Sequence, residues 1–152
     1  MKVMRCKHCL MKAEPRNGNC PACGIVPNKP KGDLSPGERR VRLHARGIRL
    51  MAMFHLVGAG AGLIMIPFFP APLAMAVLAV VNLLLAFGLA RYALPAYKAA
   101  TVYYFLIGMV NVISIQHGAI HLGGIAMALL GLYLVGNSTA KAVFERRLPE
   151  LL

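Results

Sequence analysis

Two long stretches of this chain carry no charged side chain, and they constrain its fold more than any other feature. Residues 51–90 and 99–140 contain no Asp, Glu, Lys or Arg. Charged residues make up 14% of the whole chain, whereas an ordinary soluble domain has about 25%. A helix of about 20 apolar residues is long enough to cross the hydrocarbon core of a bilayer. These stretches therefore predict an all-α membrane protein.

Breaks in the apolar sequence divide it into four predicted spans. Residues 67–72 contain three prolines, residues 91–98 contain two basic residues and a proline, and a third, uncharged turn lies at 116–119. Proline and polar loop residues commonly end helices. We predict a four-helix transmembrane bundle over residues 48–137, with spans at residues 48–69, 71–90, 96–116 and 118–136.

Positive charge predicts the orientation of this bundle. Twelve of the seventeen Lys and Arg residues fall within residues 1–50, and the other five lie in the 91–98 loop and in the C-terminal tail, residues 138–152. With four spans, these basic segments share one side of the membrane, and Lys and Arg accumulate on the cytoplasmic side. We therefore expect a multi-pass protein of a bacterial-type inner (cytoplasmic) membrane with both termini cytoplasmic. Tyr92 and Tyr97 suit the interface, where tyrosine is enriched.

A basic helix is predicted directly before the first span. Residues 27–34 are rich in Pro, Gly and Lys and predict a linker, and Ser35 followed by Glu38 forms a capping-box pattern that begins a helix. The helix, residues 35–49, carries a stripe of arginines that suits the anionic headgroups of the inner leaflet. A solvated helix end is the alternative. The predicted membrane-surface residues are Arg39, Arg42, Arg46 and Arg49.

All four cysteines form two Cys-x-x-Cys pairs within residues 1–26. Four thiolates complete the tetrahedral shell of a structural Zn²⁺ ion, each about 2.3 Å from the metal. A c-type haem needs a histidine after the second cysteine, but Leu10 and Gly24 stand there. Disulfides would imply an oxidising compartment, whereas the cytoplasmic orientation expected from the charges favours reduced, metal-binding thiols. The predicted ligands are Cys6, Cys9, Cys20 and Cys23.

This segment resembles a zinc ribbon, a small module in which two cysteine turns hold one metal ion. Besides the four cysteines, Pro21 and Gly24 match the second turn, CPACG, whereas the first turn, CKHCL, has no glycine. The resemblance implies bound zinc and contacts with protein or nucleic acid. Rubredoxin-like iron uses similar turns, but residues 1–53 contain no aromatic residue to surround such a site. A module this short buries little apolar area, and zinc would contribute about 10–16 kcal/mol to its folding.

Histidines and small residues mark further positions in the spans. His55 lies inside the first span, where a polar ring is costly and often functional. His117 and His121 share one helical face, and such a pair binds zinc or copper, or faces headgroups or a partner subunit. His8 and His44 are expected to be solvated. Small residues let helices pack closely within this chain or between chains, and the predicted packing residues are Gly58, Gly62, Gly124 and Ala128.

The functional prediction follows from what the spans and the head contain. No Ser-His-carboxylate set, paired carboxylate or phosphate-binding loop occurs in the sequence, so we do not expect an enzyme. We predict a non-catalytic integral membrane subunit, an accessory, assembly or scaffold component of a larger complex, whose zinc ribbon contacts a partner. Its expected partners are anionic inner-leaflet lipids and other membrane subunits or a second copy.

Two alternative functions stay open. The first is a membrane-tethered regulator whose basic ribbon binds nucleic acid, although the head has no aromatic side chain to stack on a base. The second is a small channel or transporter that uses His55, Asn82 and Asn111. The lack of charged residues in the spans argues against ion transport, and the two asparagines are expected to form hydrogen bonds between helices.

Overall fold

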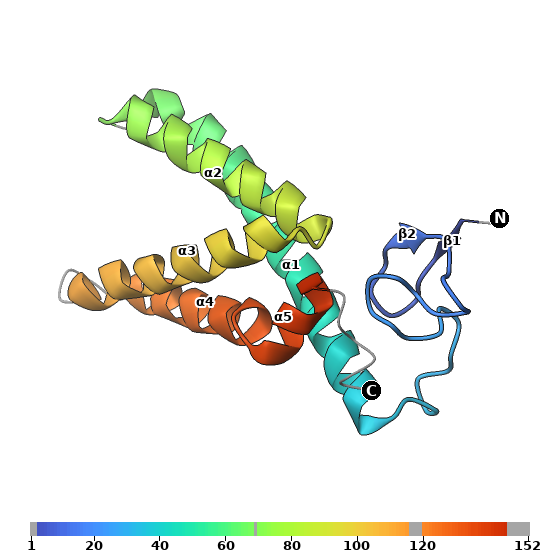
Figure 1. Ribbon diagram of the computed structural model, residues 1–152. Helices are drawn as coiled ribbons and strands as arrows, with labels where there is room; N and C mark the ends of the chain where they lie inside the picture. The colour runs from blue at the N-terminus through green and yellow to red at the C-terminus, as the bar shows by residue number, and fades with distance from the viewer. Residues whose placement is uncertain (1–2, 69, 116–119, 146–152) are drawn as a thin grey trace.

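A computed structural model describes residues 3–68, 70–115 and 120–145 of the chain (Figure 1). A small N-terminal head holds two short antiparallel strands, and helices make up the rest of the described residues. The elements in order are β1 (Met4–Arg5), β2 (Lys12–Ala13), α1 (Pro36–Met65), the 3-10 helix η1 (Ile66–Phe68), α2 (Pro72–Ala90), α3 (Leu94–Ile113), α4 (Ile120–Val135) and α5 (Ser138–Glu145).

Helix α1 joins the predicted basic helix and the first predicted span into one rod. Its 30 residues rise about 45 Å at 1.5 Å per residue. The capping box forms as the sequence indicates: the Glu38 amide donates to Ser35 Oγ at 3.2 Å, and the Ser35 amide donates to a Glu38 carboxylate oxygen at 2.7 Å. The apolar part of the rod is thus rigidly continuous with its basic start.

The prediction of a mainly helical membrane protein is confirmed. Among the described residues, α1 with η1, α2 and α3 are each long and apolar enough to cross a bilayer. Helix α4 has only 16 residues, and it passes the same test together with α5, to which it is bent by 55°. The described chain therefore holds three candidate spans, or four if the bent pair counts as one.

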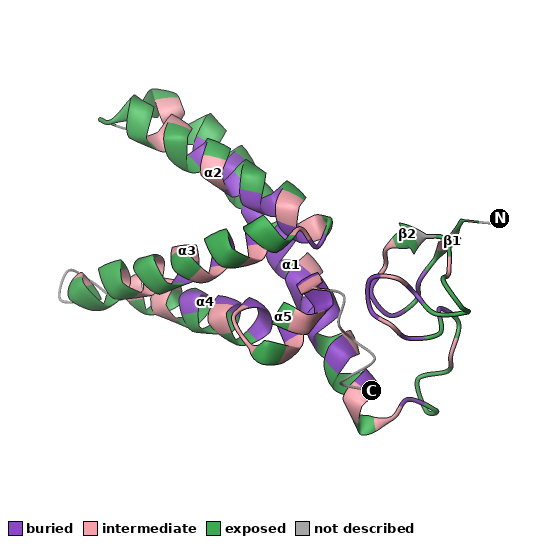
Figure 2. Ribbon diagram, in the orientation of Figure 1, coloured by how far each residue is buried: buried purple, intermediate pink, exposed green. Residues whose placement is uncertain are grey.

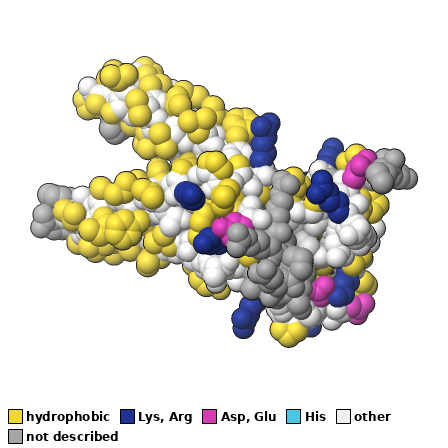
Figure 3. All heavy atoms as spheres, viewed as in Figure 1, with side chains coloured by type: hydrophobic (Ala, Val, Ile, Leu, Met, Phe, Trp, Pro, Cys, Tyr) yellow, Lys and Arg dark blue, Asp and Glu magenta, His cyan; other side chains and the backbone are white. Residues whose placement is uncertain are grey.

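The four long helices form two hairpins, α1–α2 and α3–α4, which meet near the head and diverge away from it (Figure 1). Buried residues gather where the hairpins and head meet, and the far ends of both hairpins are largely exposed (Figure 2). Apolar side chains cover these two arms, while Lys and Arg gather at the head end (Figure 3). An apolar surface of this extent is suited to lipid rather than water.

Small residues allow close packing inside each hairpin. A Cβ added to Gly62 of α1 would lie 3.3 Å from the Cβ of Ala79 on α2. A Cβ on Gly124 of α4 would overlap the Asn111 amide of α3, and Ala128 lies against Gly108. The partner helices of these predicted packing residues therefore belong to the same chain. A Cβ added to Gly58 of α1 would lie 3.5 Å from Asn82 Oδ1 of α2.

Helix α5 packs back on the joined end of the hairpins. Its apolar face, Ala140, Val143 and Phe144, is buried, and the Phe144 ring lies 5.3 Å from the ring of Tyr97 and 6.0 Å from that of Tyr92. The first part of the predicted tail is thus a helix in the core, and residues 146–152 lie outside the described residues. The head, the α2–α3 loop and α5 all lie at one end of the molecule.

Candidate metal centre and its attachment to the helices

The four cysteine sulfurs form a compact, buried cluster in the head. All four Sγ atoms lie within 4.8 Å of one another, with 3.6 Å between Cys6 and Cys23 and 3.6 Å between Cys9 and Cys20. A tetrahedron with 2.3 Å arms has edges of about 3.8 Å. The cluster therefore fits a zinc ion with four thiolate ligands, a closed shell typical of structural rather than catalytic sites.

The two cysteine turns have equivalent backbone hydrogen bonds. In the first, the Leu10 amide donates to the Cys6 carbonyl at 2.9 Å, and in the second the Gly24 amide donates to the Cys20 carbonyl at 2.8 Å. Leu10 has φ 63° and Gly24 has φ 66°. The first turn therefore adopts the same left-handed conformation without a glycine. This conformation is sterically less favourable for leucine than for glycine.

The close approach of the thiols changes how they hold protons. Hydrogen bonding from neighbouring cysteines, chiefly Cys20, lowers the pKa of Cys6, and hydrogen bonding chiefly from Cys23 lowers the pKa of Cys20 to about 7. Interaction with Cys20 raises the pKa of Cys9 and of Cys23. Such a cluster cannot ionise fully by itself, and a divalent cation would stabilise all four thiolates together.

Two histidines that were expected to be solvated are buried, so that expectation is wrong. His8, between the cysteines of the first turn, is 1% exposed, and its ring nitrogens have no hydrogen-bond partner among the described residues. His44 Nδ1 lies 3.3 Å from the Leu134 carbonyl and 3.0 Å from Asn137 Nδ2. Leu134 and Tyr133, at the end of α4, lie against the His44 ring.

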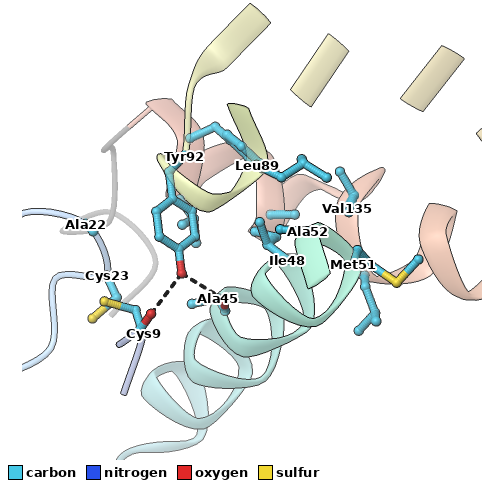
Figure 4. Packing of buried hydrophobic residues seen from close by; sticks show 14 of the residues in the cluster. Cys9, Ala22, Cys23, Ala45, Ile48, Met51, Ala52, Leu89, Tyr92 and Val135 are labelled. Atoms are coloured by element: carbon cyan, nitrogen blue, oxygen red, sulfur yellow. Dashed lines mark hydrogen bonds between the residues drawn. The ribbon is translucent and has the colours of Figure 1, made fainter. Parts of the chain in front are cut away.

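Tyr92 attaches the metal centre to the helices (Figure 4). Its hydroxyl oxygen lies 2.8 Å from the Ala45 carbonyl oxygen of α1 and 3.1 Å from the Cys9 carbonyl oxygen, so its one proton is shared between these two acceptors. The side chain is 4% exposed, so Tyr92 packs against the protein, and its predicted place at the level of the membrane interface stays a prediction. Burial, and then the nearby Cys9, raises the pKa of its phenol, while Arg49 opposes the shift. A left-handed φ of 53° turns this residue inward.

Two arginines of the predicted membrane-surface stripe donate hydrogen bonds to backbone carbonyls, and their contact with the membrane surface stays a prediction. Arg46 donates to the His8 carbonyl at 3.2 Å and to the Lys7 carbonyl at 2.8 Å. Arg39 donates to the Leu34 carbonyl at 3.1 Å. Arg42 is half-buried and lines a hollow beside the head. The stripe therefore faces the head as well as the surroundings, because the head folds back along α1.

The predicted linker is also fixed to α1. The Lys29 ammonium lies 2.7 and 2.8 Å from the two Glu38 carboxylate oxygens, and Leu34 is buried. Hydrogen bonding from Lys29 lowers the pKa of Glu38. Since Glu38 also caps α1, one side chain ties the linker to the helix. The head is thus held by contacts along its length, not by a free tether.

A polar cluster joins the two hairpins inside the apolar region. His55 of α1 lies 2.7 Å from Asn82 Oδ1 of α2 through Nδ1, and 2.7 Å from the Tyr104 hydroxyl of α3 through Nε2. These residues border a cavity of about 160 Å³. Both ring nitrogens of His55 thus have protein partners. Sequence reasoning missed Tyr104, although a hydroxyl inside a span needs such a partner.

The remaining predicted polar residues lie in a separate place. His121 Nδ1 of α4 lies 3.1 Å from Asn111 Oδ1 of α3. Asn111 therefore forms the hydrogen bond between helices that was expected of it. His117 lies outside the described residues, so its predicted pairing with His121 stays a prediction. Comparisons with protein-family models, curated proteins and solved structures gave no match.

Proposed function

We propose that this chain is a non-catalytic scaffold subunit of a membrane complex that holds a zinc-bearing head at a fixed place on the cytoplasmic surface. The observation that carries the proposal is the attachment of the head: Tyr92 and Arg46 bind the backbone of the first cysteine turn from two different parts of the helical region. A closed four-sulfur centre supplies rigidity rather than chemistry, and rigid presentation of a small surface suits protein recognition.

The orientation belongs to the same proposal. The basic start of α1, the α2–α3 loop and α5 lie at one end of the molecule, and most of the described Lys and Arg side chains seen on this face gather toward that end (Figure 3). A cytoplasmic position for that end follows the distribution of positive charge in inner-membrane proteins. Thiols in that compartment stay reduced and available to zinc.

The charge of the head favours an acidic segment of a neighbouring protein as its ligand. A hollow of about 310 Å³ lies between the head, the linker and α1, and its lining includes Lys7, Lys31 and Arg42. The Lys29 ammonium at the same place is paired with Glu38. Positive charge concentrated on a rigid surface selects partners and speeds their encounter more than it adds affinity.

Site-specific photo-crosslinking in native membranes tests this function. A photoreactive amino acid replaces Lys31, at the edge of the hollow, in the otherwise intact chain and in a Cys9→Ser variant that breaks the metal centre. We expect one discrete adduct with a membrane protein or with a second copy, and its loss in Cys9→Ser. Adducts with nucleic acid would favour the regulator instead, and no protein adduct above the level of Cys9→Ser would contradict the scaffold.

A further inference from the structure

A second hollow lies where the head meets the first hairpin, and along α1 its lining runs from the basic Arg49 to the apolar Leu56. The head contributes Arg5 and Leu10, α1 contributes Arg49, Ala52, Met53 and Leu56, and α2 contributes Ala86, Phe87 and Ala90. The groove measures about 300 Å³, which is the lower end of the range for small-molecule pockets. It is therefore suited to one end of a larger amphipathic molecule.

The basic end of the groove has unsatisfied hydrogen-bonding capacity. Arg49 is half-buried beside Tyr92, and its Nε is buried without a hydrogen-bond partner among the described residues. Arg5 of the head is exposed and lines the same groove, and none of the described lining residues is acidic. A buried guanidinium N–H without a partner is costly. Arg49 as a whole is only half-buried and also interacts with Tyr92. An anion in the groove would pair with its guanidinium, because guanidinium groups bind phosphate in a fork.

The apolar end opens toward the surface that we assign to lipid. Met53, Leu56 and Phe87 are between half and two-thirds exposed, and they lie within or at the edge of the uncharged stretch that begins at residue 51. A ligand with its anion on the two arginines would therefore direct its hydrocarbon part along α1 and α2 into the bilayer. A soluble phosphate compound would leave this end of the groove unused.

We propose that this groove is a binding site for one anionic glycerophospholipid, with its phosphate between Arg5 and Arg49 and the start of an acyl chain against Leu56 and Phe87. The first cysteine turn forms one wall through Leu10, so the metal centre helps to shape the site. The inference rests on the helices spanning a bilayer and is independent of the proposed scaffold role.

Native mass spectrometry of the full-length, zinc-loaded protein tests the site. The protein is released from detergent with phosphatidylglycerol or with phosphatidylcholine of the same chains. We expect one phosphatidylglycerol retained per chain, and at least about tenfold weaker retention of it in the Arg5→Gln/Arg49→Gln variant, the loss expected from charge-assisted contacts. Glycerol phosphate, which has the headgroup chemistry without chains, should not compete.

A matched control keeps the result interpretable. The Arg16→Gln/Arg40→Gln variant removes the same charge from the head and from α1 at exposed positions outside the groove. The single Arg5→Gln variant alters only an exposed side chain. It tests the site even if the double variant, which also changes Arg49, loses its zinc. Equal retention of the two lipids, equal loss in the control variant, or unchanged retention in Arg5→Gln would each overturn the proposal.

Discussion

The Tyr92 side chain joins three parts of the chain that lie far apart in the sequence. Its hydroxyl reaches Cys9 in the head and Ala45 in α1, and its ring lies beside Phe144 of α5. Tyr97 follows closely in the chain, but the interaction found for it is ring packing on Phe144. Tyr92 of the α2–α3 loop and Tyr97 of α3 thus have different roles, because only Tyr92 turns toward the head.

We expect Tyr92→Phe to loosen the head without removing its metal. The change deletes a buried hydroxyl and leaves two carbonyl oxygens with one donor fewer, at a cost of about 1–3 kcal/mol. Hydrogen exchange of the head amides should become faster while the zinc content stays at one ion per chain. Tyr97→Phe is the matched control. Unchanged exchange in Tyr92→Phe would show that the head is held by other contacts.

Glu38 should give the protein a pH-dependent increment of stability. Because Lys29 lowers its pKa, the increment is complete above the ordinary carboxyl value of about 4.3 and is lost as the pH falls through the lowered value. Glu38→Gln keeps the capping-box geometry but removes the charge, and should cost about 1 kcal/mol at pH 7. Thermal unfolding of both proteins in one detergent measures the difference.

The acid arm of this experiment is its control. Acid protonates the cysteine thiols of both proteins alike and would release a bound metal from both, so only the difference between the two proteins reports on Glu38. That difference should shrink once the wild-type carboxyl is protonated. A difference that stays constant from neutral to acid pH would contradict the ion pair as its cause.

At the scale of elements, the α3–α4 hairpin depends on small residues that face side chains of the opposite helix. Gly124 and Gly131 of α4 leave room for the Asn111 amide and the Tyr104 ring of α3. Asn111 in turn contacts His121, and Tyr104 contacts His55. The two glycines therefore support two polar contacts. The Asn111–His121 contact lies within the α3–α4 hairpin, and the Tyr104–His55 contact joins it to α1.

Adjacent glycines give a matched pair of substitutions. Gly124→Ala should destabilise the protein by about 1–3 kcal/mol, because the new methyl group overlaps the Asn111 amide. Gly123→Ala places a methyl group where no atom lies within 4 Å, so it should be neutral or slightly stabilising. Thermal unfolding in detergent compares the two. Equal effects would mean that α3 and α4 do not pack through this face.

At the scale of the whole molecule, the two hairpins place all connections with basic residues at one end. The α1–α2 turn, which includes Ala71, lies at the opposite end from the α2–α3 loop, which includes Arg91. Lys and Arg remain on the cytoplasmic side during membrane insertion. The chain should therefore expose the first turn outside the cell and the second inside.

Cysteine labelling of intact cells checks this orientation. We expect an impermeant maleimide to label Ala71→Cys in intact cells and Arg91→Cys only after the membrane is opened. The unmodified protein should remain unlabelled, because its four cysteines are buried. Labelling of Arg91→Cys in intact cells would reverse the orientation and place the head outside.

Local sequence features determined the helical membrane class and the cysteine cluster. Apolar length specifies candidate spans, the Ser35–Glu38 pattern specifies the start of α1, and two Cys-x-x-Cys pairs bring four thiols together. Each of these depends on residues close in the chain. The helix starts at residues 36 and 72 accordingly agree with the sequence patterns.

Only the tertiary structure decided what covers each side chain. Four contacts join residues more than 35 positions apart: His44 with Leu134, Arg46 with the His8 carbonyl, His55 with Tyr104, and Tyr92 with Ala45. A lone sequence records that a side chain is polar, but not which surface folds onto it. The divergence of the hairpins has the same origin, because it depends on which helix faces meet.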